Sequence, residues 1–79
     1  MKNPMVTARE GASYAVSRLR MVQSPMAVAF DGDRVCCLDA GSVRVRRLLE
    51  QAPDRIAGVY SPGVARETIV ADLLLVLGD

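Results

Sequence analysis

The sequence predicts a small domain that is mainly β and ends in a helix. Three observations favour this fold class: a β-hairpin pattern over residues 26–38, an alternation of valine and arginine over 43–46, and an apolar stretch without glycine or proline over 65–77. Short strands with tight turns are typical of small barrels. We therefore expect a small β-barrel or a strongly twisted antiparallel sheet with a C-terminal helix. The alternative is an α+β fold in which both terminal segments are helical.

The first segment, residues 7–21, has the pattern of a helix. Thr7 and Glu10 match a capping box, in which each side chain bonds the backbone N–H of the other residue. Gly11 weakens this prediction by roughly 1 kcal/mol relative to alanine. A strand over 14–22 is the competing assignment. Apolar residues recur at the helical spacing of three or four, namely Ala8, Ala12, Ala15, Leu19 and Val22.

Two β-rich runs, "MAVAF" at 26–30 and "RVCCL" at 34–38, are joined by "DGD". A short link that contains glycine predicts a hairpin, with Gly32 able to supply a positive φ. The period of two in "VRVRR" at 43–47 then predicts a strand with one basic face. "RIAGVY" at 55–60 predicts another strand, which ends at the turn signal "SPG".

The last segment, residues 65–77, is long enough for a helix and is apolar on nearly every side. A barrel this small covers such a helix from one side only. We therefore expect a strip of Leu74, Leu75 and Leu77 to stay uncovered. Monomers rarely leave such a strip bare, which predicts a homodimer or a protein partner that covers it.

Length and composition limit the class of protein. Residues 1–79 are expected to form a single small domain, with residues 1–20 as an N-terminal extension or helix. The hydrophobic content of 51% excludes a disordered chain, and the net charge of +1 argues against a general nucleic-acid coat. Arginine supplies nine of the ten basic residues, which favours specific bidentate contacts. No secretory or membrane-spanning pattern is recognisable, so we expect a cytoplasmic protein without membrane contact.

The adjacent Cys36 and Cys37 fall within the hairpin pattern. Successive side chains of a strand point to opposite faces, so the two thiols are not expected to hold one ion together. The chain has no histidine and no second cysteine pair to complete a tetrahedral site. We interpret both residues as structural and reduced, and we expect no metal and no cofactor.

The residue types also argue against catalysis. Without histidine the usual general base at neutral pH is missing. Asp31 and Asp33 lie two residues apart in a turn, where carboxylates are usually solvated. No segment has the spacing of a phosphate-binding loop. We therefore expect no catalytic residues and a protein that is not an enzyme.

Four short motifs follow one another in the last three quarters of the chain: "MVQSPMAV" at 21–28, "DG" at 31–32, "LDAGSVR" at 38–44 and "SPGVARE" at 61–67. Together they resemble the HypC/HupF-type chaperones of nickel–iron hydrogenase maturation. The resemblance implies an OB-like β-barrel with a C-terminal helix. The functional cysteine of that family follows its first methionine, and Val22 occupies this place here. The resemblance therefore implies that metal handling is lost and that a protein-binding barrel remains.

Residues 54–69, "DRIAGVYSPGVARETI", carry a second resemblance. This segment is similar to the strand, Ala-Pro turn, following strand and Arg-Glu helix start of the CsrA-type RNA-binding regulators. That family binds RNA as a strand-swapped dimer through an arginine at the end of its last strand. The resemblance implies this role for Arg66.

Two classes of function follow. The first, which we adopt, is a small non-catalytic protein-interaction module, similar to a chaperone, an inhibitor or an accessory subunit, that docks on a larger protein. The alternative is an RNA-binding dimeric regulator. Arginines on one strand face suit either phosphates or a carboxylate patch. The residues predicted to contact the partner are Arg44, Arg46, Arg47, Arg66, Leu74 and Leu75.

Overall fold

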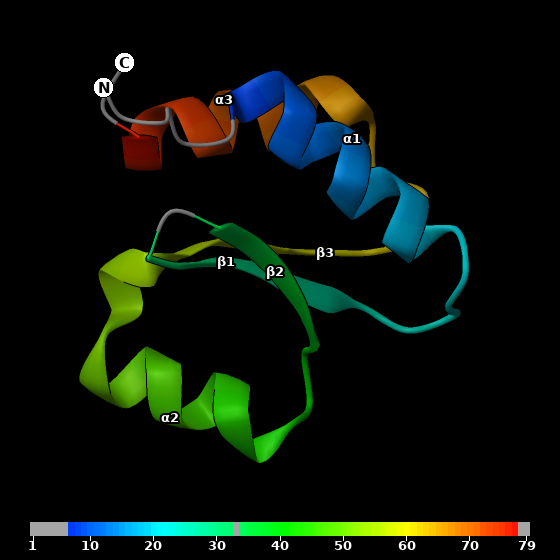
Figure 1. Cartoon of the computed structure of the whole chain (residues 1–79). Coiled ribbons are helices and arrows are strands. Elements are labelled where there is room, and N and C mark those ends of the chain that lie inside the picture. Colours follow the sequence, from blue (N-terminus) through cyan, green and yellow to red (C-terminus); the bar gives the residue numbers. More distant parts are fainter. Residues whose placement is uncertain (1–6, 33, 78–79) are drawn as a thin grey trace.

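An open antiparallel sheet and three α-helices make up the fold in a computed structural model, which describes residues 7–32 and 34–77. The elements in chain order are α1 (Ala8–Leu19), β1 (Met26–Asp31), β2 (Arg34–Asp39), α2 (Val43–Gln51), the short 3-10 helix η1 (Pro53–Arg55), β3 (Ile56–Tyr60) and α3 (Arg66–Leu77). Helices α1 and α3 cover one face of the sheet, and α2 lies on the other side (Figure 1). The fold is therefore α+β, and the predicted closed barrel is wrong.

The strand order is β2-β1-β3, so the first strand lies in the centre and both neighbours run antiparallel to it. Met26 of β1 lies opposite Asp39 of β2 and Tyr60 of β3. The pairing with β3 shifts after Val28, where the register is irregular. The two edge strands do not pair with each other. Three strands are too few to close a barrel, and residues 43–47, which were expected to form a further strand, are helical.

The predicted N-terminal helix is confirmed as α1, and the competing strand over 14–22 is wrong. Thr7 Oγ1 accepts a hydrogen bond from the Glu10 backbone at 3.1 Å, and Glu10 Oε1 accepts one from the Thr7 backbone at 3.0 Å. This reciprocal capping box satisfies two N–H groups that the helix itself leaves unpaired. Val22 lies beyond the end of the helix and is 37% exposed. The buried face of α1 consists of Ala8, Gly11, Ala12, Ala15 and Leu19.

The hairpin, the last strand and the C-terminal helix are also confirmed. The hairpin strands β1 and β2 extend until Asp31 pairs with Arg34. Gly32, in the turn, has a φ of 68°, a backbone conformation that favours glycine. Strand β3 and helix α3 occupy the segments that the sequence predicts for them.

Residues 43–51 form helix α2 and not the predicted strand. Ser42 caps the helix, since its Oγ accepts a hydrogen bond from the Val45 backbone at 3.3 Å. Arginine, leucine, glutamate and glutamine dominate the sequence that follows, and they favour the helix more than two valines oppose it. The valine alternation is also misleading, because Val45 is buried whereas Val43 is exposed. The helix ends at Gln51, shortly before Pro53, because the residue before a proline is disfavoured in the helical conformation.

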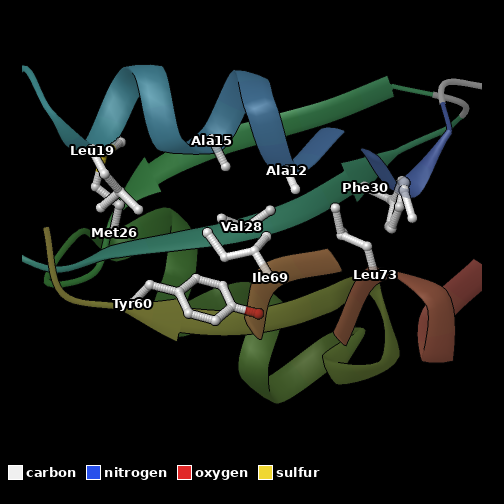
Figure 2. Close-up of a cluster of buried hydrophobic side chains, with 10 residues drawn as sticks. Ala12, Ala15, Leu19, Met26, Val28, Phe30, Tyr60, Ile69 and Leu73 are labelled. Carbon is white, nitrogen blue, oxygen red and sulfur yellow. The ribbon is translucent and has the colours of Figure 1, made fainter. Parts of the chain in front are cut away.

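One hydrophobic core fills the space between the sheet and the α1–α3 pair (Figure 2). The two helices pack against each other, and α1 also contacts β2 while α3 contacts β3. Helix α2 covers less of the other face of the sheet. The buried hydrophobic residues there are few and small, namely Ala27 and Ala29 of β1 and Val45 of α2. The buried members of the core are Ala8, Ala12, Ala15, Leu19, Met26, Val28, Phe30, Tyr60, Ile69 and Leu73.

Gly11 allows α1 to lie close to both of its neighbours. A Cβ atom at this position would meet Leu73 Cδ1 of α3 and Val35 Cγ2 of β2, each at 3.0 Å. This distance is shorter than ordinary van der Waals contact, so both side chains would have to shift by a few tenths of an ångström to admit a larger residue. The glycine that weakens the helix prediction therefore favours the close packing of α1.

A buried tyrosine joins β3 to α3. The Tyr60 hydroxyl donates a hydrogen bond to Asp72 Oδ2 at 2.7 Å, and the Asp72 side chain is half-buried. The tyrosine ring passes over Gly58, where a Cβ atom would come within 2.5 Å of the hydroxyl oxygen. Burial, reinforced by the bond to Asp72, raises the pKa of the Tyr60 hydroxyl above its ordinary value.

We expect Tyr60→Phe to lower the free energy of unfolding by about 1–2 kcal/mol, because the half-buried Asp72 loses its donor. Tyr14→Phe is the matched control, since Tyr14 is exposed and should change stability little. Urea unfolding followed by circular dichroism measures both variants. Equal effects of the two substitutions would contradict the role of the Tyr60–Asp72 bond.

The raised pKa of Tyr60 also predicts a pH dependence. The folded protein keeps the Tyr60 proton above about pH 10, where a tyrosine of the unfolded chain loses it. The stabilisation is therefore fully present below pH 10 and is lost as the pH rises further. Urea unfolding above about pH 10 should show a steeper loss of stability in the wild type than in Tyr60→Phe. Parallel pH profiles would contradict this assignment.

Candidate functional site

The three arginines predicted to share a strand face lie on α2, which separates them. Arg44 and Arg47 are three residues apart, so they lie on the same side of the helix. Arg46 lies on another side, because consecutive helical residues are turned by about 100°. All three are exposed, and none forms an ion pair with a residue that the structure describes. The predicted basic strand face is thus wrong, and a pair of arginines on one helix side takes its place.

Arg44 and Arg47 line a groove of about 350 Å³ between α2 and the sheet. Val45 is the one buried residue of α2, and the side of the helix that bears the two arginines leaves space beside the sheet. Both polar and apolar residues line the groove, although the side chain of Phe30 belongs to the core on the other face of the sheet. The polar residues are Asp31, Arg44, Arg47, Gln51 and Arg55, and the others are Phe30, Cys36, Leu38 and Leu48.

Arg55 is held in place at the wall of this groove. Its Nε donates to the main-chain carbonyl of Phe30 at 3.0 Å, and its Nη2 donates to Asp31 Oδ1 at 3.2 Å. These bonds tie η1 to the end of β1, across 25 and 24 positions of the chain. Exposed ion pairs add little stability. The main effect of the contacts is therefore to fix the position of the Arg55 guanidinium.

The groove carries a net positive charge. Three arginines line it with one carboxylate, Asp31, which is already paired with Arg55. Arg44 and Arg47 have no acidic partner within residues 7–32 and 34–77. Arginine stays charged at physiological pH, and its planar fork of donors matches carboxylates and phosphates. The groove is thus suited to bind an anion through charge-assisted hydrogen bonds.

The outer side of α3 is a second candidate surface. Leu75 is 82% exposed and Leu74 is 43% exposed, so the predicted uncovered strip is present at these two positions. Leu77 does not belong to it, because this side chain is half-buried and packs against the core. Ile69 and Leu73 are the buried residues of the helix.

Arg66 does not join the other predicted arginines. It is the first residue of α3, half-buried, and its guanidinium lies 3.8 Å from the carboxylate of Glu67. Strand β3 already ends at Tyr60, so Arg66 does not occupy a strand end. It is also absent from the lining of the groove.

The two cysteines face opposite sides of the sheet, as predicted. Cys37 packs against the core under α1 and α3, whereas Cys36 lines the groove on the α2 side. Both are free thiols. Burial raises the pKa of Cys37, and this effect is only partly opposed by the positive charge of Arg18 on α1. Cys36 is thus the thiol that adjoins the candidate anion site.

Arg55, Gln51 and Leu48 were not among the predicted site residues. Arg55 reaches the groove through contacts with residues of the hairpin, and no local pattern reports a contact across 24 positions. Because residues 43–51 are helical, Gln51 and Leu48 lie on the same side of α2 as Arg44 and Arg47. The helical spacing of 44, 47, 48 and 51 is the signal that could have identified them.

The part of the chain that the structure describes has neither a metal cluster nor a membrane span. No three Cys, Asp or Glu side chains within it lie close enough together to hold a metal ion. None of its helices has the length and apolar character needed to cross a bilayer.

Comparisons with protein families, with curated proteins and with solved structures found no match for this chain.

We expect Cys36 to react faster than Cys37 with iodoacetamide at about pH 8, because the thiolate is the nucleophile and burial raises the pKa of Cys37. Site-resolved mass spectrometry of the folded protein measures both rates. Denatured protein is the control, in which the two rates should converge. Equal rates in the folded protein would contradict the placement of the thiols on different faces.

Proposed function

We propose that this chain is a small non-catalytic protein-interaction module that docks on a larger protein through the outer side of α3. The composition of this helix, "RETIVADLLLVL", supports the proposal, because apolar residues occur on nearly every side of it. A helix of this kind is normally covered all round. Only the side that bears Ile69 and Leu73 is fully buried within the chain.

The exposed side of α3 suits a second helix as its partner. Thr68, Ala71 and Leu75 are all exposed, and their spacing of three and four aligns them in one stripe. Thr68 and Ala71 are small, so another helix can come close, and Leu75 can insert between the side chains of that helix. A larger protein with an apolar helix face fits this stripe. In the isolated protein, a second copy of α3 offers the same surface, and we therefore expect a homodimer.

A catalytic role is not part of the proposal. The chain has no histidine. Two of its carboxylates also have partners, since Asp31 pairs with Arg55 and Asp72 accepts a hydrogen bond from Tyr60. These carboxylates are held by neighbouring side chains, which favours a structural role for them.

RNA binding is the other hypothesis from the sequence, and it assigns the contact to Arg66. This residue pairs with Glu67 at the start of α3, away from the groove that holds the unpaired arginines. Arg44 and Arg47 also match phosphates, but no contact among the described residues favours an RNA backbone over another anion there. RNA binding therefore remains the alternative, and the ligand experiment on the groove includes an oligoribonucleotide as a test of it.

Leu75→Asp should dissociate the homodimer without unfolding the monomer, because the side chain is 82% exposed and contributes little to the core. We expect the wild type to be dimeric at high concentration, and the variant to have half its mass. Light scattering gives the mass, and far-UV circular dichroism on the same samples shows whether the helices are retained.

Leu49→Asp is the matched control for this experiment. Leu49 is a helical leucine that is 51% exposed on α2, on the other side of the sheet, so its replacement should leave the dimer intact. If the wild-type protein instead stays monomeric at millimolar concentration and is no less soluble than Leu75→Asp, the exposed stripe of Thr68, Ala71 and Leu75 is stable in water without a partner. That result would overturn the proposed docking surface.

A further inference from the structure

The groove between α2 and the sheet holds more positive charge than the fold requires. Arg55 has a structural role, because it ties η1 to β1. Arg44 and Arg47 have no such role, since they are exposed and pair with no acidic residue that the structure describes. Like charges one turn apart on a helix repel each other. The arginine pair therefore destabilises α2 slightly, and a bound anion would relieve this repulsion.

The number of unmatched positive charges in the groove indicates which kind of anion can bind there. With Arg55 and Asp31 paired, the two positive charges of Arg44 and Arg47 remain unmatched. A phosphate monoester carries a charge of about −1.5 to −2 at pH 7 and three acceptor oxygens. It can thus neutralise both arginines at once, whereas a single carboxylate carries one charge. Gln51 lies at the same wall and adds an amide donor.

The remaining wall of the groove is apolar, which points to an organic ligand and not to the bare ion. Leu38 and Cys36 of β2 and Leu48 of α2 line this part. The volume of about 350 Å³ lies within the range of small-molecule sites. A flat hydrocarbon or aromatic body fits against these side chains while its phosphate lies at the arginines.

We propose that this groove is a binding site for a phosphate monoester with an apolar or aromatic body, held by Arg44 and Arg47. The site is separate from α3, so the proposal is independent of the docking function. Helix α2, which forms one wall of the groove, lies on the opposite side of the sheet from α3 (Figure 1). A ligand in the groove would therefore leave the outer side of α3 free.

Isothermal titration of the wild-type protein with 1-naphthyl phosphate tests the proposal. We expect saturable binding with one ligand per chain. Inorganic phosphate has the charged group without the aromatic body, and 1-naphthol has the aromatic body without the charged group. Both should therefore bind at least about tenfold more weakly than 1-naphthyl phosphate. Binding should also weaken as salt is added, because the contacts are ionic.

The three arginines of α2 provide a matched set of variants. Arg44→Gln and Arg47→Gln should each weaken binding of 1-naphthyl phosphate by about tenfold or more, since each removes a charge-assisted hydrogen bond. Arg46→Gln removes the same charge from the same helix but lies outside the groove, and it should leave the affinity within about twofold. Circular dichroism confirms that all three variants keep the helix. Equal losses in all three would indicate a general charge effect and would overturn the site.

Cys36 provides a second measurement that places the ligand. It lines the groove, whereas Cys37 faces the core on the other side of the sheet. Saturating 1-naphthyl phosphate should slow the alkylation of Cys36 several-fold and leave the rate at Cys37 unchanged. Binding without protection of Cys36 would place the ligand elsewhere and would overturn the proposal.

Two further ligands separate the proposal from its competitors. Succinate, a dicarboxylate, should bind more weakly than 1-naphthyl phosphate, and tighter binding of succinate would overturn the choice of phosphate. A short single-stranded oligoribonucleotide should bind no more tightly than 1-naphthyl phosphate. If it binds at least about tenfold more tightly, with a steeper salt dependence, the groove is part of an RNA surface and the small-ligand proposal is wrong. Absence of any binding of 1-naphthyl phosphate at millimolar concentration would also overturn it.

Discussion

The close approach of α1 to the sheet and to α3 is the constraint on which the rest of the fold depends. The buried face of α1 is made of alanines and one glycine, with Leu19 as its only large residue. At Gly11 the neighbouring side chains of Leu73 and Val35 leave no room for a methyl group in ordinary contact. Since a chain of this size has a single small core, moving α1 outward would expose the aliphatic side chains of both other layers. Small residues on one helix therefore hold three elements together.

This one-sided core explains why a groove exists on the other side. The β1 side chains that face α2 are Ala27 and Ala29, which are too short to interlock with a helix over its whole length. Val45 alone is buried on α2, so the sides of this helix remain free to carry charge. The groove forms where the arginine-bearing side of α2 passes beside β2 and η1.

The two candidate surfaces differ in their physics and lie on opposite sides of the sheet (Figure 1). Docking at the proposed stripe on α3 would gain free energy by removing Leu75 from water, an effect that salt does not screen. Binding in the groove beside α2 would depend on charge, which salt does screen. Salt dependence would therefore distinguish the two proposed sites in one protein. Because the sheet separates them, occupation of one site would leave the other free.

The elements whose signals are local could be predicted from the amino-acid sequence. The capping box of Thr7 and Glu10, the hairpin turn at Gly32 and the apolar helix at the C-terminus depend on neighbouring residues, and the structure confirms them. The opposite orientation of the two cysteines follows from strand geometry alone. The helical form of residues 43–51 was also within reach of local signals, because the cap at Ser42 and the residues that follow it favour a helix, but the strand prediction gave more weight to the valine alternation. The contacts of Arg55 with Asp31 and of Tyr60 with Asp72 join separate elements, so only the folded chain brings their atoms together.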